Sequence, residues 1–143
     1  MIFRRDFLRL GLAAGSRCLL PMAPLSAVAA PALAAQPLFR LVHDSRADSS
    51  RAEALRLGTA LVAGRQDVAA LLRAMSGDVT RFWFDELQPV WRQQRAAVAG
   101  TTAPDVLFCL EQLARDHRLR VQWRTPVTPA GDLSLLSWLI AAA

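Results

Sequence analysis

The 143-residue chain contains no lysine and no tyrosine, and its only cysteines are Cys18 and Cys109. Cys109 is the only cysteine after residue 34, so that part of the chain cannot form an intrachain disulfide bond. A domain of this size must therefore be stabilised by its apolar core, by a partner or by a ligand.

Motifs for common kinds of catalysis and cofactor binding are also absent. The sequence has no glycine-rich phosphate loop, no dinucleotide-binding glycine fingerprint, no G-x-S-x-G nucleophile motif and no C-x-x-C-H haem attachment motif. Its two histidines, His43 and His117, lie far apart without the spacing of metal ligands, so we predict no metal site. The sequence leaves any cofactor unknown, and it favours a non-catalytic function over an enzymatic one.

The first residues carry the most specific pattern in the chain. Arg4 and Arg5 are adjacent, and Phe7 and Leu8 follow after one intervening residue. This segment resembles the twin-arginine (Tat) export signal, although Phe3 stands where the family usually has serine or threonine. The resemblance implies export to the periplasm by the Tat translocase. That route carries folded proteins, which often bind a cofactor or travel with a partner.

An alanine-rich apolar segment follows, over residues 10–35. It is interrupted by one arginine and three prolines, namely Arg17, Pro21, Pro24 and Pro31. Because a membrane-spanning helix needs about 20 mostly apolar residues in a row, we expect a removable signal and no stable membrane span. The pattern Ala32-Leu33-Ala34 predicts cleavage after residue 34, and residues 27–29 offer a second site. General secretion and a retained anchor are the alternatives.

The chain therefore divides into a cleaved signal peptide, residues 1–34, and one small domain, residues 35–143. The domain keeps 13 of the 17 arginines and 11 of the 12 acidic residues, so its net charge is +2 and not the +5 of the whole chain. Its only basic run is Arg115–Arg124. This near balance argues against a nucleic-acid partner.

Five apolar segments have the length and composition of strands, namely residues 38–42, 68–74, 96–100, 119–127 and 133–140. Residues 68–74 are also compatible with a short helix, although a strand fits the alternation of elements better. Periodicity and capping residues predict a helix from Ser49 or Ser50 to Gly64, a helix broken near Pro89, and a threonine-capped helix over 104–117. This alternation predicts a small three-layer α/β sandwich with a mostly parallel sheet and a C-terminal antiparallel hairpin.

Open parallel sheets bind ligands beyond the carboxyl ends of their strands. The polar residues expected there are His43, Asp44, Ser45, Asp78, Thr101 and Thr102. His43 and Asp44 offer acid–base chemistry, and the two threonines precede a helix, where anions bind. The alternative is that all these residues cap helices and satisfy loop backbone groups. Because consecutive strand residues face opposite sides, His43, Asp44 and Ser45 do not form a catalytic triad.

Aromatic residues crowd onto one predicted helical segment, which contains Trp83, Phe84 and Trp91 among several arginines. Tryptophan and arginine are enriched at the energetic centres of protein interfaces, so this segment is a candidate partner surface. The alternative is that both tryptophans fill the core.

Folded export, small size and missing catalytic motifs favour an exported, non-catalytic accessory or binding protein. It would act with a larger periplasmic enzyme, for which a redox enzyme is one candidate. The alternative is a small periplasmic enzyme or ligand-binding domain that uses His43 and Asp44. Residues 77–80 and 107–111 also resemble segments of small uncharacterised exported bacterial proteins, a resemblance that implies no activity.

Overall fold

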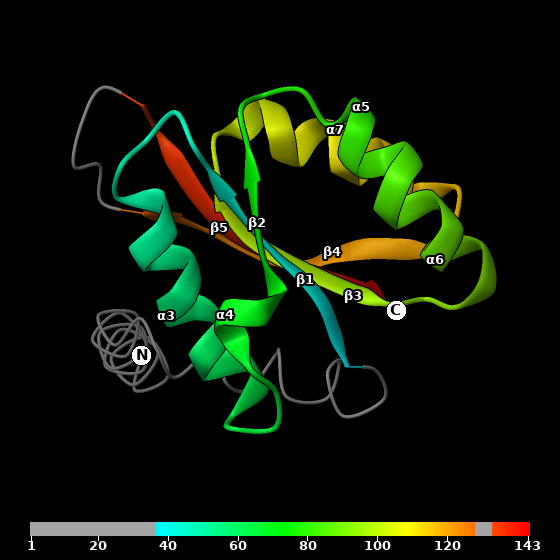
Figure 1. Ribbon diagram of the computed structural model, residues 1–143. Coiled ribbons are helices and arrows are strands. Elements are labelled where there is room, and N and C mark those ends of the chain that lie inside the picture. The colour runs from blue at the N-terminus through cyan, green and yellow to red at the C-terminus, as the bar shows by residue number, and fades with distance from the viewer. Residues whose placement is uncertain (1–36, 128–132) are drawn as a thin grey trace, which may run out of the picture.

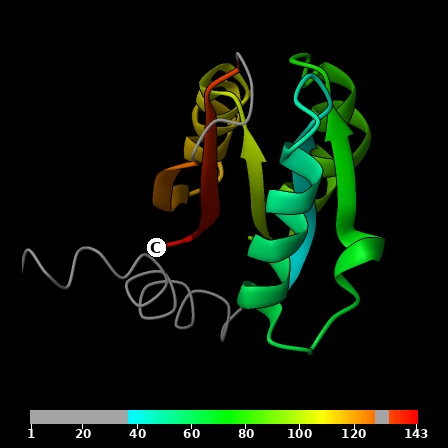
Figure 2. The same ribbon diagram turned by 90° about the vertical axis from the view of Figure 1, so that its left-hand side faces the viewer.

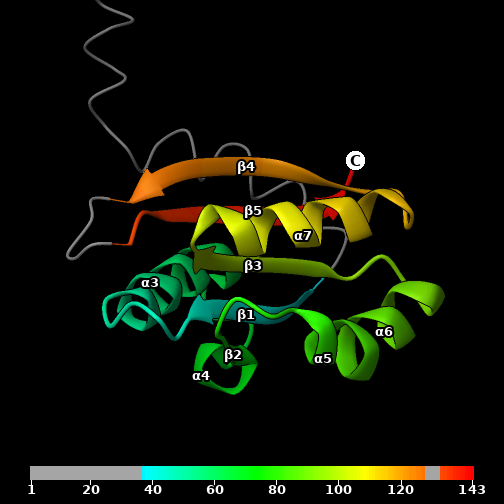
Figure 3. The same ribbon diagram turned by 90° about the horizontal axis from the view of Figure 1, so that it is seen from above.

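The computed structural model describes residues 37–127 and 133–143. Their strands form one mixed sheet, with the members β1 (Leu38–Asp44), β2 (Leu72–Met75), β3 (Ala97–Thr102), β4 (Leu119–Val127) and β5 (Leu135–Ala142). The order across the sheet is β2-β1-β3-β5-β4, which Figure 3 shows from above. Strand β1 pairs in parallel with β2 and β3, whereas β5 pairs antiparallel with β3 and β4. The predicted α/β class, parallel strands and C-terminal hairpin are confirmed.

Helices cover both faces of this sheet and complete the three predicted layers. They are α3 (Ser50–Val62), α4 (Val68–Leu71), α5 (Thr80–Phe82), the π-helix η1 (Trp83–Leu87), α6 (Gln88–Gln93) and α7 (Pro104–Arg115). Helices α3 and α4 lie on one side, and α5, α6 and α7 lie on the other (Figure 1). Figure 2 shows α3 in front of the strands.

The alternation of side chains along the strands divides the core into two clusters. Leu41 of β1 and Leu139 of β5 pack beneath Leu57 and Leu61 of α3. On the opposite face, Val42 and Trp138 belong to a cluster formed with η1, α6 and α7. Buried side chains of the latter cluster include Phe82, Leu87, Trp91, Leu107 and Leu110. The amphipathic helices are therefore held by apolar burial on the two faces of one sheet.

The break predicted near Pro89 is not found: α5, η1 and α6 follow one another directly, with joining residues in helical conformation, and the irregularity is a π-helical stretch. Pro89 lies in the first turn of α6, directly after Gln88, whose backbone N–H donates to the carbonyl of Trp83 in the π-helical pattern. The π-helix η1 precedes it and joins α5 to α6 without a loop.

Three local predictions need correction or refinement. Residues 68–75 contain both a short helix and a strand, the two alternatives for this segment, because helix α4 runs directly into strand β2. Ser49 occupies the N-cap position of α3 but makes no side-chain capping bond, so neither serine caps this helix with its hydroxyl. The threonine cap of α7 is wrong: Ala103 is the N-cap residue, and Thr102 belongs to β3.

Several predictions lie outside the described residues. They concern the twin-arginine motif of Arg4, Arg5, Phe7 and Leu8, the cleavage site after residue 34, and most of the turn before β5. In the part of the chain that the structure describes, no helix has both the length and the apolar character needed to span a membrane.

Candidate functional site

The strand-end edge where the sequence predicts a site is formed by β1, β2 and β3. Asp44, the last residue of β1, lies opposite Met75, the last residue of β2, and His43 lies opposite Thr101 of β3. The chain leaves β1 toward β2 on one side, while β3 lies on the other side of β1. The gap between β1 and β3 is therefore the switch point of the sheet, where folds of this class place their ligands.

A buried carboxylate fills that switch point. The side chain of Asp44 is fully buried, and each of its oxygens accepts two hydrogen bonds. Oδ1 accepts from the backbone N–H and from Nε of Arg46, at 3.1 and 2.9 Å. Oδ2 accepts from Nη2 of Arg46 at 2.8 Å and from the backbone N–H of Ala103 at 3.0 Å. A carboxylate has about four acceptor positions, so Asp44 keeps none for a substrate.

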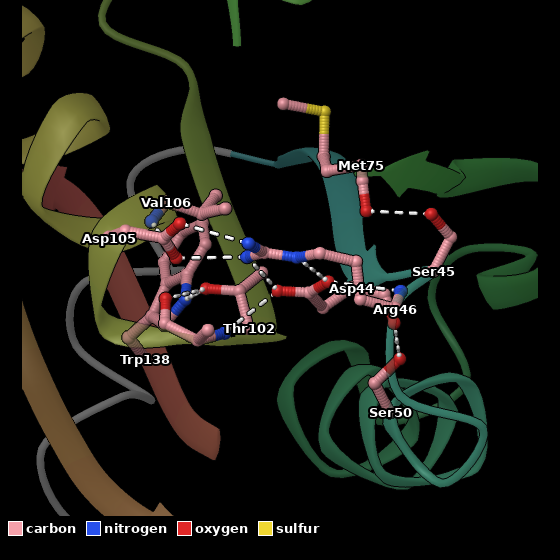
Figure 4. Close-up of polar contacts among 10 residues, drawn as sticks. Asp44, Ser45, Arg46, Ser50, Met75, Thr102, Asp105, Val106 and Trp138 are labelled. Atoms are coloured by element: carbon pink, nitrogen blue, oxygen red, sulfur yellow. Dashed lines mark hydrogen bonds and ion pairs between the residues drawn. The ribbon is translucent and has the colours of Figure 1, made fainter. Parts of the chain in front are cut away.

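Arg46 joins this carboxylate to the beginning of helix α7. Its Nη1 and Nη2 donate to the two carboxylate oxygens of Asp105 at 3.0 and 2.9 Å (Figure 4). Oδ1 of Asp105 also accepts from the backbone N–H of Val106 at 2.9 Å. The guanidinium thus bridges β1 and α7 with charge-assisted hydrogen bonds to both carboxylates. Gly77, at φ 102°, lets the loop after β2 pass close to Arg46, since a Cβ there would lie 3.0 Å from Nη1.

The electrostatics of this cluster favour its ionised form. Burial alone would raise the pKa of Asp44, but hydrogen bonds from Arg46 and the Ala103 N–H outweigh burial and hold that pKa below its ordinary value. The hydrogen bonds from Arg46 likewise lower the pKa of Asp105. The pKa of Arg46 is raised by these same two partners. All three groups are therefore charged at neutral pH.

The remaining hydroxyls at this edge are also paired within the chain. Ser45 donates to the carbonyl of Met75 at 3.0 Å, and Ser50 donates to the carbonyl of Asp44. Thr101 shares a buried hydrogen bond of 2.8 Å with Ser137. Thr102 donates to the carbonyl of Ala103 at 3.1 Å.

Trp138 completes this pairing, because its Nε1–H donates to the Thr102 hydroxyl at 3.0 Å. Both threonines are fully buried and their hydroxyls are paired within the chain, so the anion site at this helix start stays a prediction. Asp78 is apart from this cluster: it accepts from the backbone N–H of Thr80 at 2.8 Å, which is the capping alternative.

His43 lies on the other face of β1, beside α3. Its Nδ1 is buried and has no hydrogen-bond partner among residues 37–127 and 133–143. Burial and then the charge of Arg51 lower the pKa of His43, so its imidazole is neutral at pH 7. The structure thus brings Asp44, Ser45 and Thr102 to one edge but separates His43 from the Asp44 carboxylate.

The three predicted interface residues differ in burial: Trp91 is buried, Trp83 is half-buried and Phe84 is exposed. Trp91 is buried, and its Nε1–H donates to the carbonyl of Ala96 at 2.9 Å. Trp83 packs edge-on against Trp91, with ring centroids 6.0 Å apart, and His117 packs on both. Phe84 is 59% exposed and is the only one of the three predicted residues that presents a largely exposed ring.

The sequence placed Arg46 at the end of β1 but did not indicate the ion pair between Arg46 and Asp105 that organises this edge. Arg46 and Asp105 are 59 positions apart, and neither stands in a recognisable motif. The one available signal is Asp105 in the first turn of α7, which by itself indicates only a favourable helix dipole. Within residues 37–127 and 133–143, no group of three or more histidine, cysteine or acidic side chains is placed to hold a metal ion.

No protein-family model, no curated protein and no solved structure matches this chain. Its function must therefore be argued from the geometry of its own residues.

Proposed function

We propose that this chain is an exported, non-catalytic binding protein that acts as an accessory subunit of a larger periplasmic enzyme, with a redox enzyme as one candidate. The observation that carries the proposal is the state of Asp44 at the switch point of the sheet. Its carboxylate is fully buried and accepts four hydrogen bonds from Arg46 and Ala103. A general acid or base must exchange a proton with a substrate, and a saturated buried carboxylate cannot reach one.

The location follows from the resemblance of the first residues to the twin-arginine signal. Arg4 and Arg5, with Phe7 and Leu8, support export of the folded domain to the periplasm. The translocase is then a transient partner, and the enzyme that shares the compartment is the lasting one.

The experiment is native mass spectrometry of the protein recovered from the periplasm of its own host, expressed from its own gene at its normal level. We expect a mature chain that begins near residue 35, in a complex with a larger protein identified by its peptides. The R4K/R5K variant keeps both positive charges but removes the arginine pair. We expect it to leave the full-length precursor in the cytoplasm. A mature chain recovered alone would overturn the accessory role, and unimpaired export of R4K/R5K would overturn the route.

A second function, ligand binding at the strand-end edge near His43 and Asp44, is favoured by one observation. The Nδ1 of His43 is buried without a partner among the described residues, which is unusual for a polar atom and fits an acceptor for a ligand N–H or O–H. This alternative predicts a small-molecule adduct on the mature chain that the H43A variant loses. An adduct that H43A retains would contradict the assignment.

A further inference from the structure

The end of the domain opposite Asp44 carries two adjoining hollows lined largely by arginine. The larger, of about 660 Å³, lies between the end of α7, the first residues of β4 and the segment before β3. Its charged lining is Arg95, Glu111, Arg115, Arg118 and Arg120. The smaller, of about 250 Å³, contains Arg92 and Asp116 and shares Arg95 and Arg118 with the larger. We call the two together the arginine hollow.

Three of these arginines have no carboxylate partner among the described residues. Glu111, the acidic side chain in the larger hollow, pairs with Arg124 at 3.1 Å and with Arg115 at 3.7 Å. Arg95, Arg118 and Arg120 form no ion pair within 37–127 and 133–143. Their guanidinium groups are therefore available to an incoming anion.

The arginine hollow also concentrates the positive charge of the domain. It holds five of the 13 arginines of residues 35–143 but only two of the 11 acidic residues. The rest of the domain then has eight arginines against nine acidic side chains. Even with the carboxylate of Ala143, which lines the larger hollow, arginines exceed anionic groups there. This asymmetry favours a negatively charged partner at one end of the molecule.

The backbone at Arg118 gives an independent indication. This residue lies just after the end of α7 with φ at 58°, in the left-handed region that favours glycine. The sequence keeps a long charged side chain at a position where glycine would fit with less strain. Strain of this kind is commonly retained where the side chain has a binding role.

We propose that the arginine hollow binds an acidic segment of the partner protein, through two or more of its carboxylates. The guanidinium fork of arginine matches a carboxylate in two parallel hydrogen bonds. Pockets for small molecules are mostly apolar with a few polar groups. The lining of the arginine hollow is more polar than apolar and carries several guanidinium groups, which suits acidic side chains presented by a protein surface. This inference rests on the proposed accessory function, because it identifies where the partner docks.

The test measures binding of synthetic hexaglutamate to the mature protein by isothermal titration calorimetry at low and at physiological ionic strength. We expect binding that weakens as salt rises, since exposed charges are screened. The R118G/R120Q variant removes two unpaired guanidinium groups and should bind about tenfold more weakly, in keeping with modest energies for exposed ion pairs. The matched control is R51Q/R56Q, which makes the same charge change on exposed positions of α3. It should bind like the wild type.

Three results would overturn the inference. The first is that hexaglutamine binds as tightly as hexaglutamate. The second is that R118G/R120Q and R51Q/R56Q lose the same amount of affinity for hexaglutamate. The third is that a six-nucleotide oligothymidylate binds more tightly than hexaglutamate. The outcome is separable from that of the proposed function. A native complex that survives R118G/R120Q would refute the docking site but leave the accessory role standing. Hexaglutamate binding by a chain that has no partner in the periplasm would refute the accessory role and leave the arginine hollow as an anion site without a docking role.

Discussion

At the residue scale, Asp44 links three parts of the chain that are remote in sequence. It ends β1, holds the loop residue Arg46, and accepts the backbone N–H of Ala103 before α7. Replacing it by asparagine leaves Arg46 with one carboxylate partner instead of two. We expect D44N to lower the free energy of unfolding by about 2–4 kcal/mol, since a buried ion pair loses one partner. Urea unfolding followed by circular dichroism measures this change.

Asp105 provides the matched control for that prediction. Its side chain contacts the same guanidinium but is more than half exposed. D105N should therefore cost less than about 1 kcal/mol, because water replaces an exposed ion pair at little loss. Equal effects of D44N and D105N would contradict the assignment of Asp44 as the buried centre of the cluster.

Replacing Arg118 by glycine should raise stability, whereas D44N and D105N lower it. Its φ of 58° is strained for a residue with a Cβ and unstrained for glycine. R118G should raise the free energy of unfolding by about 0.5–1 kcal/mol, even as it weakens binding in the arginine hollow. R115G, at the last residue of α7, should instead lower stability by about 0.5–1 kcal/mol through helix propensity. The midpoints of thermal unfolding of the two variants, compared with that of the wild type, measure these changes. A midpoint of R118G below that of the wild type would contradict the strain at Arg118.

At the scale of elements, α3 packs on β1 through the missing side chain of Gly58. A Cβ there would lie 2.6 Å from Cδ2 of Leu41 and 2.8 Å from Cγ1 of Val68. Leu41 is fully buried, so it has no free space into which to move. We expect G58A to destabilise the protein by about 1–3 kcal/mol through overpacking, although alanine is intrinsically the better helix former. Chemical denaturation measures the difference.

The neighbouring variant T59A gives the control for G58A. Thr59 is exposed on the outer side of α3, where its hydroxyl donates to the carbonyl of Leu55. Its replacement should change stability by no more than about 0.5 kcal/mol. A G58A protein as stable as T59A would show that α3 can shift on the sheet.

Elements with a strong apolar pattern were predictable from the sequence, and their junctions were not. The spacing of apolar residues in β1, β3 and α7 follows from the burial of these elements, so it could be read from the sequence. The sequence could not decide between helix and strand for residues 68–75, because four helical residues and four strand residues share one largely apolar run. The threonine cap was wrong because tertiary packing keeps Thr102 in β3, bonded to Trp138.

The candidate site shows the same division. The sequence located Asp44, Ser45 and Thr102 at one sheet edge, because the carboxyl ends of parallel strands meet there. It did not indicate that Arg46 would fill that edge, since the ion pair with Asp105 depends on the three-dimensional approach of two distant segments. That Arg95 and Arg118 have no ion-pair partner in the part of the chain that the structure describes is likewise a property of the folded surface and not of any motif.

At the scale of the whole molecule, the two ends of the sheet have opposite electrostatic character. At the strand-end edge, the positive charge of Arg46 is matched by the carboxylates of Asp44 and Asp105. At the other end, arginines exceed acidic groups. The first arrangement stabilises the fold, and the second leaves charge available for association. Charge-removing substitutions in the Asp44 cluster should therefore act mainly on stability, whereas those in the arginine hollow should also weaken binding of an anionic partner.

Stability of the whole domain should fall in two steps as the pH is lowered. The pKa of His43 is depressed in the folded protein, so below about pH 6.5 the unfolded chain binds a proton that the folded chain resists. The pKa values of Asp44 and Asp105 are also depressed. Their contribution is complete above the unfolded pKa of about 3.9 and is lost as the pH falls below it.

The free energy of unfolding, measured in urea at pH 7.5, 5.5, 4 and 3 for the wild type and for H43Q and D44N, separates these two steps. H43Q should remove the decrease in stability between pH 7.5 and 5.5 and keep the decrease below pH 4. D44N should start from a lower stability but lose less of it between pH 4 and 3, because one depressed carboxyl is gone. A D44N protein that loses as much stability as the wild type below pH 4 would place the acid sensitivity outside the Asp44 cluster. In that case the negative charge of Asp44 would not be the source of the stability that is lost in acid.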